Sequence, residues 1–355
     1  MQPLRVPALL LGLAVLGHGL GFASAQAANA VDAYIADADG YNLVSLGATT
    51  FNGVSDTAGG LAIDGAFTVE NNSTTLVNMM GISSGPSLYA TGAFSVPTSS
   101  DTVQLNHGYA ALPDAGSGWT WNSSAKTLTA SGEGSLHYNS SATQDPLSQN
   151  PNWNWTSLVS DFDSASDTLY APPPGTQTGT ISVDSGGNLA LTTGATSGVV
   201  VFTFNAANLS GNQYNGQTIQ NFAVNVPTGL TYVINVTNLA GGSDFLSGIN
   251  VNAGSNDGQL LWNFDSASDG SFTLSNGGKF YGSVLAPNLT ITSDTYLEGQ
   301  VVVGSLTQNQ DELDDEDELG SVAIPEPPMS AWFAAAAALA GVLLLPICHR
   351  PSAQS

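Results

Sequence analysis

The sequence predicts a mainly β protein: a parallel β-helix, or solenoid, with one flanking α-helix, an N-terminal signal helix and a C-terminal transmembrane helix. Three observations carry this prediction. Short apolar segments bounded by glycine, asparagine and aspartate recur along the chain. One stretch in the middle has the spacing of an amphipathic helix instead. The two ends are apolar and differ from everything between them.

Residues 1–27 have the composition of a secretory signal peptide. A basic start precedes an apolar stretch over residues 6–20 and a small-residue Ala-Ser-Ala site. This order is typical of a segment that is removed on export, and not of a structural helix. Cleavage after Ala25 or Ala27 would leave a mature chain that begins near Ala28.

Residues 28–310 form the predicted β-solenoid domain. Three segments in it share a glycine, two or three apolar residues, two turn residues and then an apolar residue with a threonine: 60–69, 282–291 and 299–307. The last two can be superimposed, which places Val284 over Val301, Leu289 over Leu306 and Thr290 over Thr307. Stacked coils of this kind bury an apolar column that no single coil could bury alone. A β-sandwich would also give short strands with regular turns, but the solenoid is the preferred interpretation.

One segment breaks the β pattern and predicts the flanking helix. Its apolar residues follow spacings of three and four: Trp155, Leu158, Val159, Phe162, Ala165 and Leu169. The predicted helix begins near Asn154 and ends before Pro172, and its apolar stripe must lie on the flank of the β-structure. Residues 116–151 ahead of it predict long loops or an irregular insertion, and residues 181–306 behind it return to a dense β pattern.

The charge of the chain is strongly negative. It has 4 Lys and Arg residues against 28 Asp and Glu residues, and its formal net charge is −24. Between the two ends only Lys126 and Lys279 are basic, so nucleic acid and anionic lipid are not expected as partners. Neutral glycans, cations or basic patches on other proteins are favoured as partners instead.

The acidic run 311–318 opens a predicted linker over residues 311–323. The single cysteine, Cys348, lies beyond it, so the exported body has no disulfide.

The predicted C-terminal segment covers residues 324–355. Within it, the uncharged run 331–347 is the predicted transmembrane helix, close to the lower limit of about 17 residues that a bilayer requires. His349 and Arg350 follow it, and a basic flank on this side favours a cytoplasmic C-terminal end.

Pro325, Glu326 and Pro327 precede this apolar run, and the arrangement resembles the PEP-CTERM sorting signal of Gram-negative bacteria. The resemblance implies transient insertion in the inner membrane and cleavage near the motif by an exosortase-type processing enzyme. It also implies delivery to the cell surface or to the exopolysaccharide matrix of a biofilm. The alternative is a plain C-terminal membrane anchor.

The body of the chain has a second resemblance. The segments that carry it are 41–44, 60–63, 260–264, 280–288 and 298–303. Together they are similar to the choice-of-anchor A family of bacterial surface proteins, over most of residues 32–308. The resemblance implies an adhesin-like function at the cell surface, with extracellular polysaccharide or surface proteins as partners, and without catalytic turnover.

Four tryptophans form a group of candidate contacts. Trp119 and Trp121 alternate along an extended stretch and point the same way, so they are the candidate ligand contacts if that face is exposed. Trp153 and Trp155 belong to the same group. Trp262, within an apolar strand, is expected to be a core residue.

No cofactor and no specific metal site are expected. Asp37 and Asp39 begin a pattern of alternating oxygen ligands, but Ala48 stands where a calcium loop of about 12 residues needs its glutamate. They are interpreted as turn residues. Weak, non-specific calcium binding is expected of a chain this acidic.

Catalysis is not expected, because the chain lacks GxSxG, HExxH and phosphate-loop motifs. Two other functions stay open. One is a polysaccharide-active enzyme of β-helix form, with Glu133 or Asp161 as formal candidates. The other is ice binding, since stacked glycine-bounded coils are similar to bacterial ice-binding domains. Against it, Thr-x-Thr pairs are few, and Thr127/Thr129 and Thr290/Thr292 do not form an evident flat array.

Overall fold

The computed structural model describes residues 26–319, except 39, 71–72, 79–84, 152, 173, 255–256, 265–269, 277, 311 and 315–318. The predicted signal segment before residue 26 lies outside the described residues. So do the sorting motif at Pro325, Glu326 and Pro327 and the apolar run that follows it. Among the described residues, no helix has the length and hydropathy that crossing a membrane requires.

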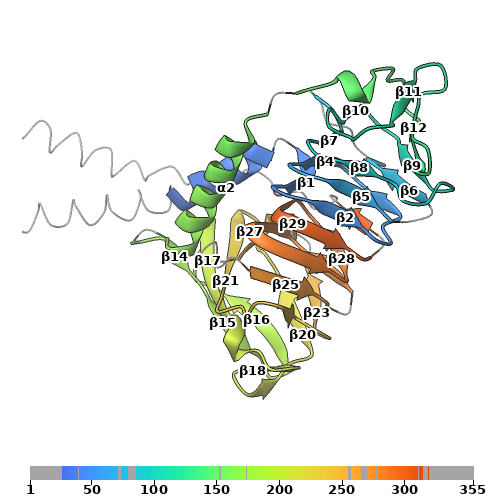
Figure 1. Ribbon diagram of the computed structural model, residues 1–355. Coiled ribbons are helices and arrows are strands. Elements are labelled where there is room, and N and C mark those ends of the chain that lie inside the picture. Colours follow the sequence, from blue (N-terminus) through green and yellow to red (C-terminus); the bar gives the residue numbers. More distant parts are fainter. Residues whose placement is uncertain are drawn as a thin grey trace, which may run out of the picture.

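The prediction of a mainly β protein with parallel strands is confirmed. The strands stack in parallel ladders, and each coil of the chain contributes to three faces (Figure 1). The helix face contains, in spatial order, β10 (Ala110–Ala111), β7 (Leu88–Ala90), β4 (Gly60–Ile63), β1 (Tyr41–Ser45), β29 (Val301–Gln308), β27 (Ser283–Ser293), β24 (Leu260–Phe264), β21 (Leu230–Thr237), β17 (Gly198–Asn205) and β14 (Gln177–Thr178).

The other two faces repeat this order. The second face contains β8 (Phe94–Ser95), β5 (Phe67–Val69), β2 (Thr49–Phe51), the C-terminal parts of β29 and β27, β25 (Gly270–Leu274) and β22 (Ser243–Phe245). The third face contains β13 (Ser135–Tyr138), β9 (Thr102–Leu105), β6 (Ser73–Leu76), β3 (Asp56–Thr57), β30 (Glu312–Asp314), β28 (Tyr296–Glu298) and β26 (Lys279–Tyr281). Beside β26 it continues with β23 (Asn250–Ala253), β20 (Asn221–Val224) and β16 (Asn188–Thr192).

The order of the coils in space differs from their order in the chain. The first strand, β1, pairs with β4 on one side and with β29, near the end of the domain, on the other. The chain therefore starts in the middle of the sheet, runs to one end at β10, crosses to the far end and returns from β14 to β29. Figure 1 shows this seam as blue strands beside orange and red ones.

Of the three pairs predicted by superimposing the last two repeats, one is correct. Val284 pairs with Val301 as predicted. A bulge between Ala286 and Thr290 then shifts the register, so Ile291 faces Leu306 and Thr292 faces Thr307. The predicted pairs of Leu289 with Leu306 and Thr290 with Thr307 are wrong, because the sequence gives no sign of the extra residues in β27.

Glycine is required where these coils turn. Gly282 and Gly299 have φ angles of 96° and 121°, in the region that residues with a side chain avoid. A Cβ atom on Gly299 would also lie 2.9 Å from the carbonyl carbon of Gly282 in the neighbouring coil. The glycines that open the last two predicted repeats, Gly282 and Gly299, are thus needed for both the turn and the stacking.

Residues 116–151, where the sequence predicts long loops or an irregular insertion, contain three short strands. They form a hairpin of β11 (Thr120–Asn122) and β12 (Thr127–Thr129), followed by β13, which extends the third face. At the other end of that face, β15 (Thr180–Val183) pairs antiparallel with β16. A separate hairpin joins β18 (Gln213–Tyr214) and β19 (Gln217–Thr218). Antiparallel strands therefore close both ends of the third face, where a parallel edge would otherwise be open.

The flanking helix is confirmed. α2 (Trp155–Tyr170) begins after Asn154, whose side chain accepts from the Ser157 backbone N–H at 3.2 Å, and it ends before Pro172. A second helical segment over residues 26–38 was not predicted as part of the domain. Both pack on the outer side of the helix face. The buried residues of this layer include Ala27, Ala28, Val31, Tyr34, Phe162, Ala165 and Leu169.

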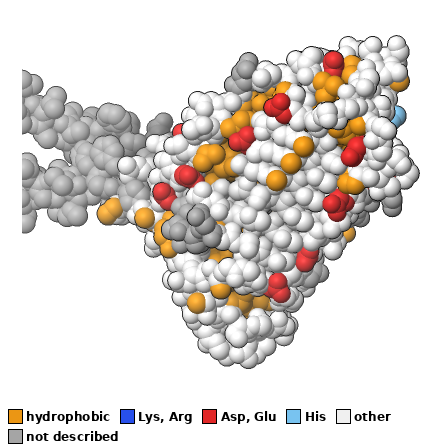
Figure 2. All heavy atoms as spheres, viewed as in Figure 1, with side chains coloured by type: hydrophobic (Ala, Val, Ile, Leu, Met, Phe, Trp, Pro, Cys, Tyr) orange, Lys and Arg blue, Asp and Glu red, His pale blue; other side chains and the backbone are white. Residues whose placement is uncertain are grey.

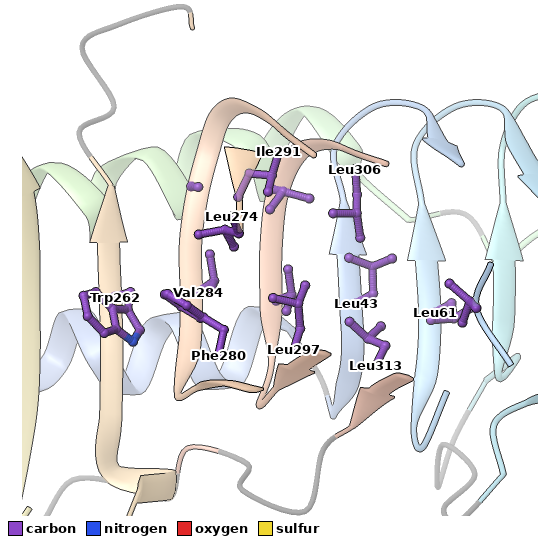
Figure 3. Packing of buried hydrophobic residues seen from close by; sticks show 14 of the residues in the cluster. Leu43, Leu61, Trp262, Leu274, Phe280, Val284, Ile291, Leu297, Leu306 and Leu313 are labelled. Atoms are coloured by element: carbon purple, nitrogen blue, oxygen red, sulfur yellow. The ribbon is translucent and has the colours of Figure 1, made fainter. Parts of the chain in front are cut away.

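The interior of the solenoid is the apolar column that the repeats predict. Figure 3 shows buried side chains from successive coils, among them Leu43, Leu61 and Val284, pointing into the space between the faces. Trp262 lies in this column with no exposed surface, and its indole N–H donates to the carbonyl of Tyr281 at 2.8 Å. The expectation that Trp262 is a core residue is confirmed.

The acidic run is not simply a linker. Glu312–Asp314 forms β30, which pairs with β28 and β3 on the third face. Leu319 is then buried with the helix layer. The domain therefore extends past the predicted boundary at residue 310, and the last coil includes part of the acidic run.

Candidate functional site

The second face has a regular alternation that separates core from surface. In β5, Phe67 and Val69 point inward and are buried, whereas Thr68 between them is half-buried at the surface. β25 repeats the pattern with Thr273 between two buried residues. Because side chains alternate along a strand, each coil presents one such outward position at the same height.

These outward positions align into one row, which we call the threonine row. The register pairs Thr68 with Thr50, Thr50 with Thr307, Thr307 with Thr292, and Thr292 with Thr273. Neighbouring strands lie about 4.7–4.9 Å apart, so the four steps of the row span roughly 19 Å. Five identical side chains thus stand at one constant spacing.

The hydroxyl groups of the threonine row are not used by the protein. Within the described residues, none of the five makes a hydrogen bond to another protein group. All five side chains are half-buried, since each stands between its neighbours in the ladder. A β-branched residue has few χ1 rotamers in a strand, so the row is also stiff. The surface offers unused hydroxyls and methyl groups in fixed positions.

Different residues end the row on its two sides. Ser95 pairs with Thr68, but its hydroxyl donates to Glu133 Oε2 at 3.0 Å. The same carboxylate oxygen accepts the backbone N–H of Val96 at 2.9 Å. At the other end, Asp244 pairs with Thr273 and is exposed. Glu133 is a formal catalytic candidate from the sequence. Here its carboxylate accepts hydrogen bonds from a serine and from the backbone.

A parallel row lies two residues earlier in each coil, and it differs on the two sides of the seam. On the C-terminal side it contains Ser305, Thr290 and Ser271, and Thr290 Oγ1 and Ser305 Oγ are 2.9 Å apart. On the N-terminal side, Ala48 and Ala66 stand at the corresponding positions. The hydroxyl surface is therefore two rows wide on one side of the seam and one row wide on the other.

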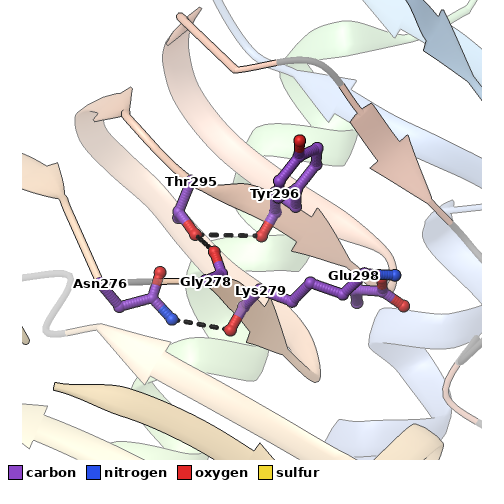
Figure 4. Close-up of polar contacts among 6 residues, drawn as sticks. All are labelled: Asn276, Gly278, Lys279, Thr295, Tyr296 and Glu298. Carbon is purple, nitrogen blue, oxygen red and sulfur yellow. Dashed lines mark hydrogen bonds and ion pairs between the residues drawn. The ribbon is translucent and has the colours of Figure 1, made fainter.

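The centre of the second face carries no charge. Figure 2, drawn from the same side as Figure 1, shows a mainly uncoloured surface with red side chains toward its edges and no blue. The two lysines of the domain are engaged elsewhere. Lys126 donates to the carbonyl of Ser140 at 2.8 Å, and Lys279 forms an ion pair with the buried Glu298 on the third face (Figure 4).

The two tryptophans predicted as ligand contacts lie elsewhere. Trp119 is only 9% exposed; its ring packs on Phe94 with centroids 5.1 Å apart, and its indole N–H donates to the carbonyl of Phe94 at 3.1 Å. Trp121 packs on Tyr138 at 4.8 Å and is half-buried. Trp119 thus has no open ring face for stacking, which the prediction required.

Two carboxylates lie together in the helix layer. Asp37 and Asp161 line a shallow groove between the helical segment 26–38 and α2. Burial raises the pKa of Asp37, and the charge of Asp161 raises it further. Asp161 also accepts from the Ser157 hydroxyl at 3.1 Å. Asp161 and Glu133 lie on different faces, so the two formal catalytic candidates do not meet.

A metal site is not evident in the described part of the chain. No group of three or more His, Cys, Asp or Glu side chains there is arranged to hold a metal ion. Asp37 lies in the helical segment 26–38, so its interpretation as a turn residue is wrong, and Asp39 lies outside the described residues.

Sequence reasoning missed the threonine row. The two Thr-x-Thr pairs noted in the sequence do not form one array with each other, but Thr290 and Thr292 stand on the second face, and Thr292 is a member of the row. Thr127 and Thr129 lie on the third face, in β12. The available signal was a threonine directly after a buried residue in coil after coil. It is hidden because the coils that form the row are far apart in sequence.

Comparison with known proteins gives a family and several solved structures of low similarity. The family described as "Putative Ice-binding-like adhesive domain" matches residues 34–313. No curated protein matches the chain. An ice-binding protein from an Antarctic biological consortium shares 14% identity with it, covering 79% of this chain and 88% of that one, with a TM-score of 0.31.

Two other solved structures are similar to the same degree. The DUF3494 domain of an ice-binding protein from Shewanella frigidimarina shares 12% identity over 79% of this chain and 95% of that chain, with a TM-score of 0.32. A glycosylated ice-binding protein from an Arctic yeast shares 13% identity over 82% and 96%, with a TM-score of 0.29.

Proposed function

The chain belongs to the family of ice-binding-like adhesive domains, and we propose that it is an exported, non-catalytic adhesive domain that binds through the threonine row. The ligand is a surface with regularly spaced hydrogen-bonding groups. The observation that carries the proposal is the row itself: five threonines at one spacing, with hydroxyls that no described protein group uses.

The geometry of the row favours an extended ligand over a small molecule. A small ligand is bound by a concave pocket with a few convergent polar groups. The second face offers instead a repeated motif along roughly 19 Å. Each contact would be weak, but several identical contacts made together give useful affinity to a ligand that repeats at a compatible spacing.

Two ligands fit this description. Extracellular polysaccharide is supported by the predicted export and by the uncharged hydroxyl surface, which needs no basic residues. Ice is supported by the regular array of threonine methyl and hydroxyl groups. The strand positions that form the row contain no aromatic residue, so stacking on sugar rings is not the mode of contact. These features favour a contact in which the threonine hydroxyl and methyl groups meet an ordered layer of the ligand.

One substitution in the threonine row tests binding to both ligands. Thr307→Lys places a long charged side chain at the middle of the row. Thr129→Lys is the matched control, since Thr129 is an exposed strand threonine on the third face. Adsorption of the labelled protein to growing ice and to insoluble cellulose or chitin is measured for both. Adsorption to either ligand that only Thr307→Lys removes supports the proposal, and the ligand affected identifies the class.

Catalysis is not part of the proposal. One oxygen of the Glu133 carboxylate, Oε2, accepts from the Ser95 hydroxyl and the Val96 backbone N–H, and Asp161 lies on a different face. Polysaccharides incubated with the domain should release no reducing ends. Release that is lost in Glu133→Gln or Asp161→Asn would favour the β-helix enzyme instead.

Sorting to the surface is the second part of the proposal. Pro325, Glu326 and Pro327 are the sorting motif, the run 331–347 is the transient membrane helix, and an exosortase-type enzyme removes the tail. The intact mass of the protein recovered from the native cell surface or matrix tests this. A chain that ends near Pro325 supports it, and one that keeps residues 331–347 contradicts it.

A further inference from the structure

A row of amides and carboxylates borders the threonine row, two residues further along each coil. Its members, which we call the amide row, are Glu70, Asn52, Asn309 and Asp294. The backbone ladder continues to this height, because the N–H of Asn52 donates to the carbonyl of Gln308 and that of Asn309 to the carbonyl of Ser293, both at 2.8 Å. Side chains two residues apart in an extended chain point to the same side. The amide row therefore forms one edge of the second face.

Side-chain hydrogen bonds fix the orientation of the amides. Asn52 Nδ2 donates to Asn309 Oδ1 at 3.3 Å, and Asn309 Nδ2 donates to Asp294 Oδ1 at 2.7 Å. The chain of donors thus ends on a carboxylate, which when ionised can only accept. A ligand would meet polar groups that are already oriented, and this lowers the entropy that binding costs.

Each of these three side chains keeps hydrogen-bonding capacity that the protein does not use. An amide nitrogen carries two N–H groups, and an amide oxygen has two lone pairs. Within the described residues, Asn52 uses one N–H, and Asn309 uses one N–H and one lone pair. Asp294 uses one carboxylate oxygen and keeps the other. Asn52 and Asp294 are exposed and Asn309 is half-buried, so donors and acceptors lie side by side along an accessible edge.

These groups suit sugar hydroxyls better than they suit ice. A sugar hydroxyl both donates and accepts, so it can donate to the second Asp294 oxygen or accept from the remaining N–H of Asn309. Hydrogen bonds to an ionised carboxylate are roughly twice as strong as those between neutral groups. Against a rigid ice lattice, the same carboxylate would lose its liquid water, and an ion without a partner is costly to desolvate.

The charge of the surface selects among polysaccharides. Carboxylates of Glu70 and Asp294 stand at the two ends of the amide row, and Lys126 and Lys279 are engaged elsewhere. An anionic polymer would be repelled here. A cationic polymer would be attracted to any part of a chain whose net charge is −24, with no need of this row. A neutral polymer is the one that the hydrogen-bonding groups themselves can select.

We propose that the amide row determines the specificity of the second face, and that the ligand of this face is a neutral, hydroxyl-rich polysaccharide. The inference rests on the proposed function, because the threonine row supplies the rest of the contact. The polymer lies along the second face with its hydroxyls on the threonines. Hydroxyls along one side of the polymer exchange hydrogen bonds with Asn52, Asn309 and Asp294.

The test is adsorption of the labelled protein to insoluble cellulose, a neutral polymer, and to growing ice. Asn309→Leu removes every side-chain hydrogen bond of the middle residue at nearly constant size. Asn106→Leu is the matched control: Asn106 is a half-buried amide at a corner of the third face, where it donates to Asn78 and accepts from Asn139, both at 2.8 Å. Asn309→Leu should adsorb to cellulose about tenfold more weakly than the parent, and Asn106→Leu should adsorb as the parent does.

Two results would overturn the inference alone. One is equal adsorption of the parent and Asn309→Leu to cellulose, and the other is a parent that adsorbs to ice but not to cellulose. In both cases the proposed function stands if Thr307→Lys abolishes the adsorption that the parent shows. An unchanged Thr307→Lys, or a parent that adsorbs to neither ligand, contradicts the proposed function and this inference together.

A second variant keeps the test decisive if leucine disturbs the fold. Asn309→Asp has the shape of the parent side chain but cannot donate to Asp294. It should show the same loss of adsorption to cellulose, measured beside Asn106→Asp at a temperature where both are folded. Equal adsorption of these two variants would overturn the inference.

Discussion

Thr50 in the first coil lies directly beside Thr307 in the last. Both side chains point outward on the second face, and together they join the two halves of the threonine row. The proposed binding surface is therefore complete only when the start of the domain has paired with its end. The same seam closes the core beneath, where Leu43 pairs with Val301.

The seam should contribute strongly to stability. Leu43 has no exposed surface, and Leu43→Ala should lower the free energy of unfolding by about 2–5 kcal/mol through lost burial and the cavity that remains. Val301→Ala should be destabilising too, and the double variant should deviate from additivity by about 0.5–3 kcal/mol. Urea denaturation measures all three. Strict additivity would mean that the first and last coils do not contact each other as described.

The attachment of α2 should depend on one buried hydroxyl. Ser166 is fully buried, and its Oγ donates to Asn263 Oδ1 at 2.7 Å. Ser166→Ala would leave that buried oxygen without its donor and should cost about 1–3 kcal/mol in urea denaturation. Ser160→Ala, at an exposed position of the same helix, is the control and should change little. Equal stability of the two variants would refute this role of Ser166.

The stability of the domain should carry opposite pH signatures from two aspartates. Burial, and then Asp161, raise the pKa of Asp37 above its usual 3.8, so the folded state holds this proton more tightly than the unfolded state. The contribution of Asp37 therefore favours folding at low pH and is lost as pH rises through its raised pKa. Asp37→Asn should increase Tm at pH 7, and its advantage should shrink as pH falls through the raised pKa of Asp37 and be gone below about 3.8.

Asp184 supplies the opposite case. Hydrogen bonds from the Asn188 backbone and side chain, and from the Gly186 backbone, lower its pKa. Its contribution is present above the unfolded-state pKa and is lost as pH falls through the folded-state value. Asp184→Asn should therefore lower Tm at pH 7 and have little effect in acid. The same direction of change in both variants at pH 7 would contradict the assignments.

Trp119 should affect stability and not recognition. Trp119→Ala should lower the free energy of unfolding by about 3–5 kcal/mol, because the side chain is buried against Phe94. At a temperature where the variant is folded, its adsorption to ice and to insoluble polysaccharide should equal that of the parent. Lost adsorption with unchanged stability would restore the stacking interpretation.

The sequence was sufficient for the features that are local. The helix over Trp155–Tyr170 follows from apolar spacing, a capping asparagine and a following proline, all within one stretch of chain. The parallel coils follow from glycine-bounded repeats. The pair Val284 and Val301 was found for the same reason, since the two segments are adjacent in the chain.

Features that depend on distant contacts could not be predicted in the same way. The bulge in β27 shifts the register without a change in hydrophobic pattern. The seam between β1 and β29 joins the two ends of the domain, and no local pattern records which coils become neighbours. The threonine row depends on both the bulge and the seam. Thr292 meets Thr307 only after the shift, and Thr307 meets Thr50 only across the seam.

The most direct test of the account is the adsorption of the labelled domain to ice and to insoluble polysaccharide in three forms: parent, Thr307→Lys and Thr129→Lys. The account predicts at least one ligand to which Thr307→Lys binds about tenfold or more weakly than the parent, while Thr129→Lys binds as the parent does and all three share one Tm. Equal adsorption of the parent and Thr307→Lys to every ligand that the parent binds would contradict it.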